Sequence, residues 1–220
     1  TALRFLLPVC AATGGGEIAY TGRERPTEAL VSSLAARGAV ITRAGNAYHV
    51  GGALKSGVFT LPGDVSSQYI SGLLFALPLL RGDSEIIMTT PPVSAGYIDM
   101  TLDALAAFGV SVGRRADGFS VRGWQRYLSP GLAVCEGDCS AGAVWRAANA
   151  MGHEVTARGM PAVTRQPDAA IDDFLAQTEI DVSGAPDLMP LLAAVAATRN
   201  GVATRIYGVA RLTCKESDRP

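Results

Sequence analysis

Leu61-Pro-Gly-Asp-Val-Ser-Ser-Gln68 is the stretch that decides the fold, and the apolar run Tyr69-Ile-Ser-Gly-Leu-Leu-Phe-Ala-Leu-Pro-Leu-Leu80 follows it directly. The Gly-Asp pair predicts a turn, and the run after it predicts a helix that begins near Ser66. Free backbone N–H groups and the positive dipole end at such a terminus attract anions. Two hydroxyls and an amide side by side therefore indicate a phosphate site. The alternative is an ordinary serine N-cap, which accounts for one serine but not for three adjacent polar residues.

The composition describes a densely packed globular protein. Of the 220 residues, 48% are hydrophobic and only 18% are charged, which excludes disorder as the main state. This length allows one compact unit or two. The formal net charge is −1 and no basic patch stands out, so the sequence gives no case for nucleic-acid binding.

The cysteines and the apolar N-terminal run indicate a reduced, cytoplasmic protein without a metal. No Cys-x-x-Cys spacing occurs, and only two histidines are present to assist in binding a metal. The four cysteines are Cys10, Cys135, Cys139 and Cys214. The run of residues 2–12 contains Arg4 and is far shorter than a membrane span, so we expect neither a membrane segment nor a targeting segment.

An internal repeat with a constant offset of 71 residues organises the chain. Residues 26–52 match residues 97–123, and apolar residues recur at helical spacing in both copies. A glycine follows each helical pattern in the C-cap position, Gly38 in the first copy and Gly109 in the second. Two short alternating strands come next. Each copy therefore predicts a helix followed by a β-hairpin.

A second kind of segment interleaves with the first. Residues 63–88 correspond to residues 137–159 at an offset of 74 residues, and partial relatives lie at residues 1–20 and 181–207. Each of these segments predicts an alanine- or leucine-rich helix and then a short strand. Together the two kinds form a unit of about 70 residues, larger than common solenoid repeats. The sequence predicts an α/β fold in which repeated units enclose helices.

The third copy is short. A helical leucine precedes a turn aspartate by 30 residues in the first copy and by 33 in the second, but by only 12 in the third, from Leu175 to Asp187. Residues 166–177 begin an amphipathic helix, yet the glycine cap and the hairpin that should follow are missing. We therefore expect about twenty residues to be absent between Gln177 and Thr178.

Six short motifs, in order and at compatible spacing, resemble those of the 5-enolpyruvylshikimate-3-phosphate synthase family. The start of the chain, Thr1-Ala-Leu-Arg4, is similar to a further segment of that family. The six motifs are Arg23-Glu-Arg-Pro26, Asp64-Val-Ser-Ser-Gln-Tyr69, Tyr97-Ile-Asp-Met-Thr101, Glu136-Gly-Asp138, Pro186-Asp187-Leu188 and Lys215-Glu-Ser-Asp-Arg219. The resemblance covers essentially the whole chain.

The resemblance implies transfer of the enolpyruvyl group from phosphoenolpyruvate to the 5-hydroxyl of shikimate 3-phosphate, with release of phosphate. It also implies a two-domain enolpyruvyl-transferase fold built from repeated βαβαββ-type units with buried helices. The first domain would then be residues 1–135, without its N-terminal part, and residues 136–220 would be part of the second. No cofactor is implied, the two substrates are the expected partners, and the protein is expected to be a monomer.

The resemblance assigns the shikimate 3-phosphate site to hydroxyl, amide and charged side chains. Ser66 and Ser67 resemble the seat of its phosphate, and Gln68 is placed to touch both substrates. The other residues implied to bind this substrate are Ser94, Tyr97, Asp187 and Lys215. Without the resemblance, Tyr97 is an ordinary half-buried aromatic at a helix start and Asp187 an N-cap.

The resemblance assigns phosphoenolpyruvate to Thr1, Arg25, Gln68 and Arg219. A guanidinium fork suits the phosphate and carboxylate of this substrate, although Arg25 alone would be taken for a solvated charge. Asp187 and Glu216 are implied to be the acid-base groups, because addition and elimination need proton transfer at carbon and at oxygen. Without the resemblance, the cluster that contains Glu216 would be a charged surface run.

Departures from the family pattern predict that this chain alone is inactive, although the full-length protein would be an enzyme. The early lysine-serine-arginine motif would precede Thr1, and the late arginine and lysine would follow Pro220. Two alternatives stay open. A sister transferase that acts on UDP-N-acetylglucosamine shares the fold and donor, but no cysteine stands in a suitable loop before Arg25 to play its reactive thiol. A non-catalytic phosphosugar-binding α/β repeat protein would keep the phosphate seat without the chemistry.

Overall fold

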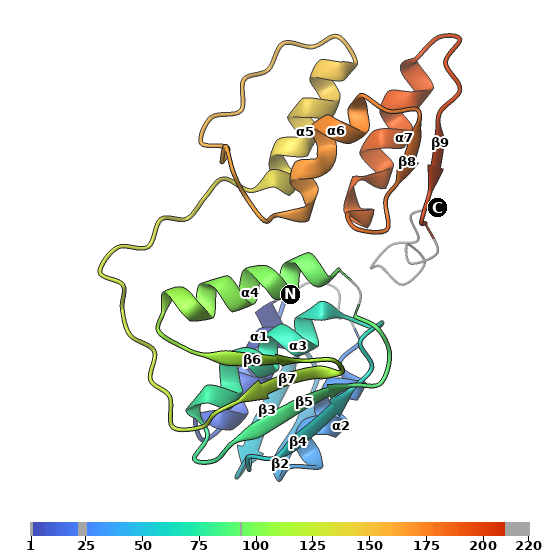
Figure 1. The fold of residues 1–220 in the computed structure, drawn as a ribbon. Coiled ribbons are helices and arrows are strands. Elements are labelled where there is room, and N and C mark those ends of the chain that lie inside the picture. The colour runs from blue at the N-terminus through green and yellow to red at the C-terminus, as the bar shows by residue number, and fades with distance from the viewer. Residues whose placement is uncertain (1, 22–25, 93, 210–220) are drawn as a thin grey trace. The chain divides into compact units, whose positions relative to one another are not determined.

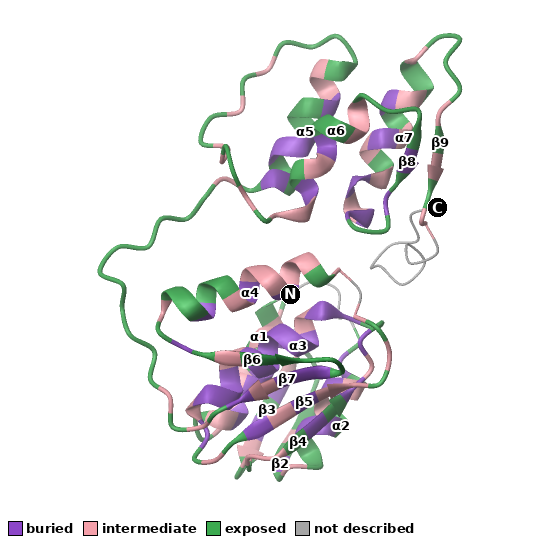
Figure 2. Cartoon of the chain, in the orientation of Figure 1, coloured by how far each residue is buried: buried purple, intermediate pink, exposed green. Residues whose placement is uncertain are grey.

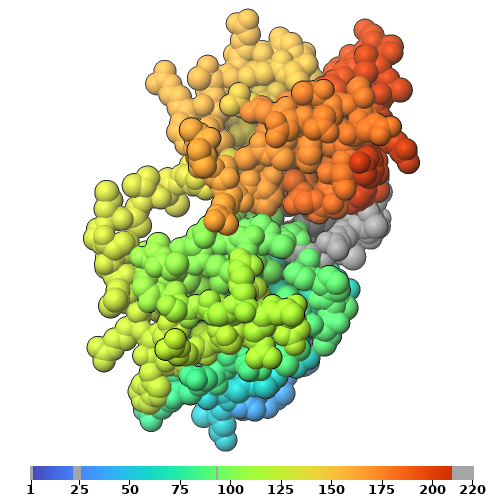
Figure 3. Space-filling view, in the orientation of Figure 1, coloured from blue at the N-terminus to red at the C-terminus, as the bar shows by residue number. Residues whose placement is uncertain are grey.

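The computed structural model describes residues 2–21, 26–92 and 94–209. The chain divides into two compact units, Thr1–Leu132 and Ala133–Pro220, each described by itself below (Figure 1). Residues 122–138 have no regular secondary structure and are largely exposed (Figures 2 and 3). The first part of this segment is tied to the first unit, since the amides of Trp124, Gln125 and Leu128 donate to carbonyls of that unit.

The first unit consists of two helix–strand–helix–hairpin series joined by one additional strand. In chain order its elements are α1 (Ala2–Ala12), β1 (Gly16–Ala19), α2 (Glu28–Ala35), β2 (Ala39–Ala44), β3 (Ala47–Gly52), β4 (Val58–Leu61), α3 (Ser67–Ala76) with a 3-10 turn (Leu77–Leu79), β5 (Ser84–Met88), α4 (Ala95–Ala107), β6 (Val112–Arg115) and β7 (Gly118–Val121). The predicted helices and hairpins of both copies are confirmed.

The strand pairing repeats along with the sequence. One sheet has the order β1-β3-β2, and the other has β4-β5-β7-β6, so β5, β7 and β6 reproduce the first sheet. The hairpin register is conserved at the 71-residue offset: Ile41 pairs with Val50, and Val112 pairs with Val121. β4 is an addition, and it runs parallel to β5. The repeat found in the sequence is therefore a structural repeat.

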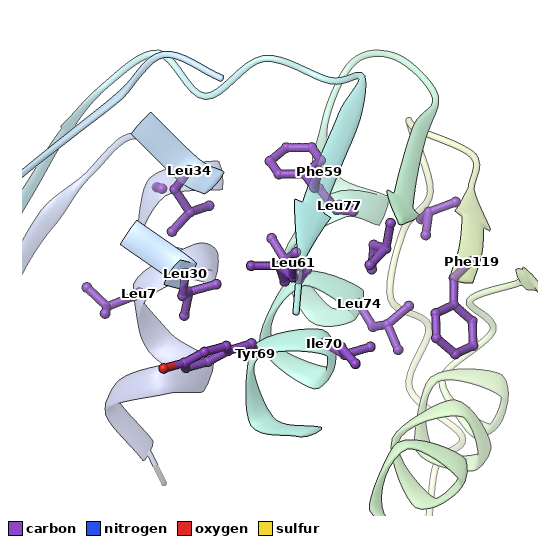
Figure 4. Close-up of a cluster of buried hydrophobic side chains, with 14 of the residues drawn as sticks. Leu7, Leu30, Leu34, Phe59, Leu61, Tyr69, Ile70, Leu74, Leu77 and Phe119 are labelled. Carbon is purple, nitrogen blue, oxygen red and sulfur yellow. The ribbon is translucent and has the colours of Figure 1, made fainter. Parts of the chain in front are cut away.

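Helix α3 is buried on nearly all sides, which confirms the expectation of a buried helix (Figure 2). Its small and apolar residues pack with side chains from α1, α2 and β4, including Leu7, Leu30 and Leu61 (Figure 4). Gly72 permits a close approach of α1, because a Cβ at this position would lie 2.4 Å from the carbonyl oxygen of Arg4. Packing of this kind holds the N-terminus of α3 in a fixed place.

The second unit is smaller and has its own apolar core. Its elements are α5 (Cys139–Ala150), a 3-10 turn (Pro167–Ala170), α6 (Ile171–Leu175), β8 (Glu179–Asp181), a 3-10 turn (Pro186–Leu188), α7 (Met189–Thr198) and β9 (Arg205–Tyr207). β8 and β9 pair in parallel, with Ile180 opposite Ile206. Ile171, Ile180 and Leu192 are among the buried residues of this core.

One expectation for the second unit was wrong. Residues 153–158, which should form a strand after α5, have no regular structure. In the first unit, β5 occupies this place and pairs with β7 of the following hairpin. The third copy has no such hairpin, so a strand here would lack a partner for its backbone groups. The helix expected to begin in residues 166–177 is present as a 3-10 turn followed by the short α6.

No described helix is both long enough and apolar enough to cross a membrane.

Candidate functional site

The turn before α3 places three polar residues at the positive end of a ten-residue helix. Ser66 is the N-cap, with extended backbone (φ −163°, ψ 125°), and its Oγ accepts a hydrogen bond from the Gln68 amide at 3.2 Å. Ser66 and Ser67 are buried, and Gln68 is half-buried. Within the described chain, no residue hydrogen-bonds the Ser67 hydroxyl. We call Ser66, Ser67 and Gln68 the seat.

A buried arginine supports the seat from beneath. Arg4, in the first turn of α1, is 7% exposed, and its Nη1 donates to Ser66 Oγ at 3.2 Å and to Gln68 Oε1 at 3.3 Å. Its Nε and Nη2 both donate to the carbonyl oxygen of Pro26, at 3.1 and 2.7 Å. The Tyr69 hydroxyl donates to the same oxygen at 2.6 Å, and the Arg4 guanidinium lies 5.1 Å from the Tyr69 ring centroid. The guanidinium is therefore fixed in one orientation.

Burial shifts the pKa values of these two side chains in opposite directions. It lowers the pKa of the Arg4 guanidinium, against the smaller opposing effects of the Tyr69 phenol and the Glu28 carboxylate. It raises the pKa of Tyr69, whereas the nearby Arg4 cation lowers it. Since a guanidinium starts from a very high pKa, Arg4 keeps its charge and Tyr69 stays neutral. Positive charge thus lies beneath a helix terminus that already favours anions.

The segment that carries Ser94 is attached to the turn before the seat. Thr90 Oγ1 donates to Asp64 Oδ1 at 2.7 Å and accepts from the amides of Gly63 and Asp64, at 2.9 and 3.1 Å. A Cβ on Gly63 would lie 2.3 Å from the Thr90 carbonyl oxygen, so only glycine allows this approach. Ser94 stands before α4 with a left-handed backbone (φ 52°).

Tyr97, in the first turn of α4, is connected to α3 through hydroxyl groups. Thr101 Oγ1 donates to the Tyr97 carbonyl oxygen at 2.9 Å, and it lies 2.7 Å from Ser71 Oγ of α3. α4 also packs directly on α3. The structure thus brings the segments of Ser94 and Tyr97 against the turn and helix that form the seat.

The N-terminus of α5, the equivalent helix of the second unit, is capped differently from the N-terminus of α3, and this difference makes it less suited to an anion. At the 74-residue offset, Asp138 corresponds to Asp64. Asp138 caps α5 itself, and its Oδ1 accepts from the amides of Ser140 and Ala141 at 2.9 and 3.4 Å. A carboxylate on those amides repels a second anion. In the first unit Thr90 holds the aspartate instead, and the neutral Ser66 caps the helix.

The other predicted site residues lie in the second unit or outside the described residues. Asp187 lies in the second unit, half-buried in the 3-10 turn before α7. The remaining predicted residues, Thr1, Arg25, Lys215, Glu216 and Arg219, lie outside the described residues. Across the described parts of the chain, no cluster of His, Cys, Asp and Glu side chains is arranged to hold a metal ion.

Sequence reasoning missed Arg4 and Thr90. The sequence could have indicated a role for Arg4, because a single charged residue in an otherwise apolar helix predicts a buried polar contact. No sequence pattern indicates a role for Thr90, since its hydrogen-bond partners lie 26 and 27 residues away in another turn. The repeated fold and the donor-lined helix terminus define the class: an α/β repeat protein with a helix terminus suited to an anionic group.

Comparisons with known proteins narrow this class to one family. Residues 1–183 match the EPSP synthase (3-phosphoshikimate 1-carboxyvinyltransferase) family, and the chain belongs to it. The 3-phosphoshikimate 1-carboxyvinyltransferase of Clostridium kluyveri is 39% identical over 245 residues, covering 99% of this chain and 57% of the relative. That of Methanocorpusculum labreanum is 34% identical over 246 residues, covering 100% of this chain and 58% of the relative.

Solved structures show the same fold. An EPSP synthase from Acinetobacter baumannii matches with a TM-score of 0.72 and 21% identity, covering 99% of this chain and 57% of that chain. The enolpyruvyl transferase NikO from Streptomyces tendae matches with a TM-score of 0.62 and 13% identity, covering 93% of this chain and 56% of that chain. The predicted α/β enolpyruvyl-transferase fold is thereby confirmed. The chain spans a little more than half the length of these relatives.

Proposed function

We propose that the protein to which this chain belongs transfers the enolpyruvyl group from phosphoenolpyruvate to the 5-hydroxyl of shikimate 3-phosphate and releases phosphate. The observation that carries the proposal is the seat: two serine hydroxyls and a carboxamide at the positive end of a buried helix, above a buried arginine. Membership of the EPSP synthase family supports the choice of substrates.

Within this proposal, the first unit binds shikimate 3-phosphate. The Ser66 and Ser67 hydroxyls donate hydrogen bonds to its phosphate, and these bonds replace those to the water that a dianion loses on binding. Gln68 contacts both substrates, and Ser94 and Tyr97 add contacts from the segments attached to the seat. No step in this binding needs a metal or a cofactor.

The chemistry belongs to residues that the seat does not contain. We assign the deprotonation of the 5-hydroxyl and the proton transfer at the methylene carbon to Asp187 and Glu216. A carboxylate can serve as base in the addition step and return a proton in the elimination step. Lys215 contacts shikimate 3-phosphate, and Thr1, Arg25 and Arg219 hold phosphoenolpyruvate with Gln68, where planar guanidinium groups match phosphate and carboxylate oxygens. These assignments rest on the family motifs.

We further infer that the protein is a cytoplasmic monomer, that residues 1–135 and 136–220 belong to two different domains, and that the third repeat lacks about twenty residues. The relative from Clostridium kluyveri aligns over 245 residues, more than the 220 of this chain, so the alignment includes positions that this chain lacks. The direct passage from α6 to β8, without a hairpin, supports a shortened third repeat.

Calorimetric titration with shikimate 3-phosphate tests the proposal on this chain. Binding is the appropriate measurement because the chain spans 57% of its relative, and we expect no steady-state release of phosphate from it. Ser67→Ala removes a seat hydroxyl without removing the N-cap, and should weaken binding by about tenfold. Ser32→Ala is the control, since Ser32 is exposed on α2. If the wild type and Ser67→Ala bound shikimate 3-phosphate with equal affinity, the claim that the seat binds the phosphate would be refuted. Normal turnover by this chain would refute the expected inactivity.

A further inference from the structure

Two neighbouring strands end side by side at the turn before α3, and each is followed by one half of a polar contact. β4 and β5 are parallel, and the last pair of their ladder is Leu61 with Met88. Asp64 follows the end of β4, and Thr90 follows the end of β5. The parallel pairing therefore brings these two residues together, and Thr90 Oγ1 donates to Asp64 Oδ1 at 2.7 Å.

The Thr90 hydroxyl uses its full hydrogen-bonding capacity on this turn. It has one hydrogen, which goes to the Asp64 carboxylate, and two lone pairs, which accept from the amides of Gly63 and Asp64 at 2.9 and 3.1 Å. The carboxylate is thereby held by Thr90. The cap of α3 is instead Ser66, whose Oγ accepts from the Gln68 amide at 3.2 Å.

The second unit repeats this turn with glycine in the place of Thr90. A Cβ on Gly63 would lie 2.3 Å from the Thr90 carbonyl oxygen, and a Cβ on Gly137 would lie 2.4 Å from the Gly159 carbonyl oxygen. Gly159 thus makes the same close approach as Thr90 but has no hydroxyl. The Gly137 amide donates to the Gly159 carbonyl oxygen instead, at 3.1 Å.

The aspartate of the second unit, which has no threonine beside it, caps its own helix. Asp138 Oδ1 accepts from the amides of Ser140 and Ala141 at 2.9 and 3.4 Å, and α5 begins directly after this aspartate. At the 74-residue offset, the equivalent amides belong to the two serines of the seat. Aspartate and serine are both favoured N-caps, so the sequence before α3 offers two alternative caps, Asp64 and Ser66.

From this difference we propose that Thr90 is a positioning residue that decides which side chain caps α3, and that it keeps the seat open to a phosphate group by holding the Asp64 carboxylate. Without the Thr90 hydroxyl, Asp64 would cap α3 as Asp138 caps α5. The carboxylate on the first amides would then repel a phosphate. Thr90 does not touch the ligand. The inference rests on the proposed function, because it concerns the same seat, and it adds a residue to which the family motifs give no role.

Carbon-13 NMR of the ligand-free 220-residue chain tests the choice of cap without any ligand. Thr90→Val keeps the shape of the side chain and removes the hydroxyl. In this variant the Ser66 Cα signal should move from an extended toward a helical value, because an Asp64 cap places Ser66 inside the helix. Thr90→Ser keeps the hydroxyl and should leave the signal in place. Thr89→Val is the matched control, since Thr89 is exposed and its hydroxyl makes only a 3.5 Å contact with the Leu61 carbonyl oxygen.

Calorimetric titration with shikimate 3-phosphate and with shikimate, which lacks the phosphate, tests the consequence for binding. For Thr90→Val we expect the phosphorylated ligand to bind about two- to fivefold more weakly and shikimate to bind as it does to the wild type. The ratio of the two dissociation constants should therefore shrink by the same factor. Thr90→Ser and Thr89→Val should keep the wild-type ratio. General loosening of the turn would instead weaken both ligands alike.

The two measurements separate the two proposals. A Ser66 signal that stays extended in Thr90→Val, or equal weakening of both ligands, would overturn the positioning role of Thr90. A wild-type chain that binds both ligands equally would refute the proposed function, whereas the ligand-free spectra would still decide which residue caps α3. Should Thr90→Val not fold, Thr90→Gly takes its place with the same expected results, because it introduces the residue that the second unit has at this position.

Discussion

Replacing Gly72 with alanine should loosen the first unit by forcing α1 away from α3. The new Cβ would lie 2.4 Å from the Arg4 carbonyl oxygen and 3.2 Å from Pro8 Cγ, whereas ordinary van der Waals contact begins at 3.4 Å. The obstacle is the backbone of a packed helix, so it cannot rotate away as a side chain would. α1 must therefore retreat by about 1 Å, and Arg4 moves with it.

Two opposing effects set the size of the loss. Alanine is favoured over glycine inside a helix by about 0.5–1 kcal/mol. Overpacking a close helix contact costs about 1–3 kcal/mol, and a backbone obstacle places this case in the upper part of that range. The free energy of unfolding should fall by about 1–2 kcal/mol, and the melting temperature by about 2–4 °C for each kcal/mol.

Amide hydrogen exchange measured by mass spectrometry resolves this effect by element, which suits a chain of two units. Peptides from α1 and α3 should exchange faster in Gly72→Ala. Gly142→Ala in α5 is the matched control, because the nearest obstacles are the Cε and Sδ atoms of Met160, at 2.5 and 2.9 Å, and this flexible side chain can move. Slower exchange in α1 and α3 of Gly72→Ala, or equal loosening by both substitutions, would refute the reasoning.

Three further predictions follow from the same contacts. Thr90→Val should release the Asp64 carboxylate toward the seat and weaken shikimate 3-phosphate binding roughly two- to fivefold, as measured by calorimetry. Adding Asp64→Asn to this variant should restore the affinity. A double variant that binds as weakly as Thr90→Val would contradict the prediction. Leu34→Ala and Leu105→Ala, at equivalent buried positions, should each cost about 2–5 kcal/mol in urea denaturation, and a large difference between them would argue against equivalent packing. Burial raises the pKa of the Tyr127 hydroxyl from 10.0 to about 12. The neutral hydroxyl therefore stabilises the folded state below pH 10, and this stabilisation should be lost as the pH rises from about 10 to about 12. Tyr127→Phe should lack this part of the loss of stability, and identical pH profiles for the two proteins would contradict the prediction.

The repeat was predictable because it is encoded in local patterns. Helical spacing, a glycine after the helix and an alternating hairpin are each visible within about thirty residues. The hairpins form as predicted, and their register repeats at the 71-residue offset, with the pairs Ile41–Val50 and Val112–Val121. Ser66 is the N-cap of α3, as one interpretation predicted, and its role in a phosphate site stays a prediction.

The strand expected over residues 153–158 could not be judged from its own sequence. A strand forms only where a partner supplies hydrogen bonds, and the partner belongs to a hairpin that this chain lacks. Arg4 was missed for a related reason: its partners Pro26 and Ser66 lie 22 and 62 residues away. Local sequence shows that a buried charge needs partners, but only the packing of α1 against α3 shows which ones.

The most direct measurement of the central claim is a nitrogen-15 NMR titration of the chain with shikimate 3-phosphate. We expect the backbone amides of residues 66–69, at the start of α3, to shift most and in proportion to the amount of ligand bound. The equivalent amides of residues 139–142, at the carboxylate-capped start of α5, should stay in place. Larger shifts at α5 than at α3, or no shift at residues 66–69 when calorimetry detects binding, would contradict the claim that α3 holds the phosphate.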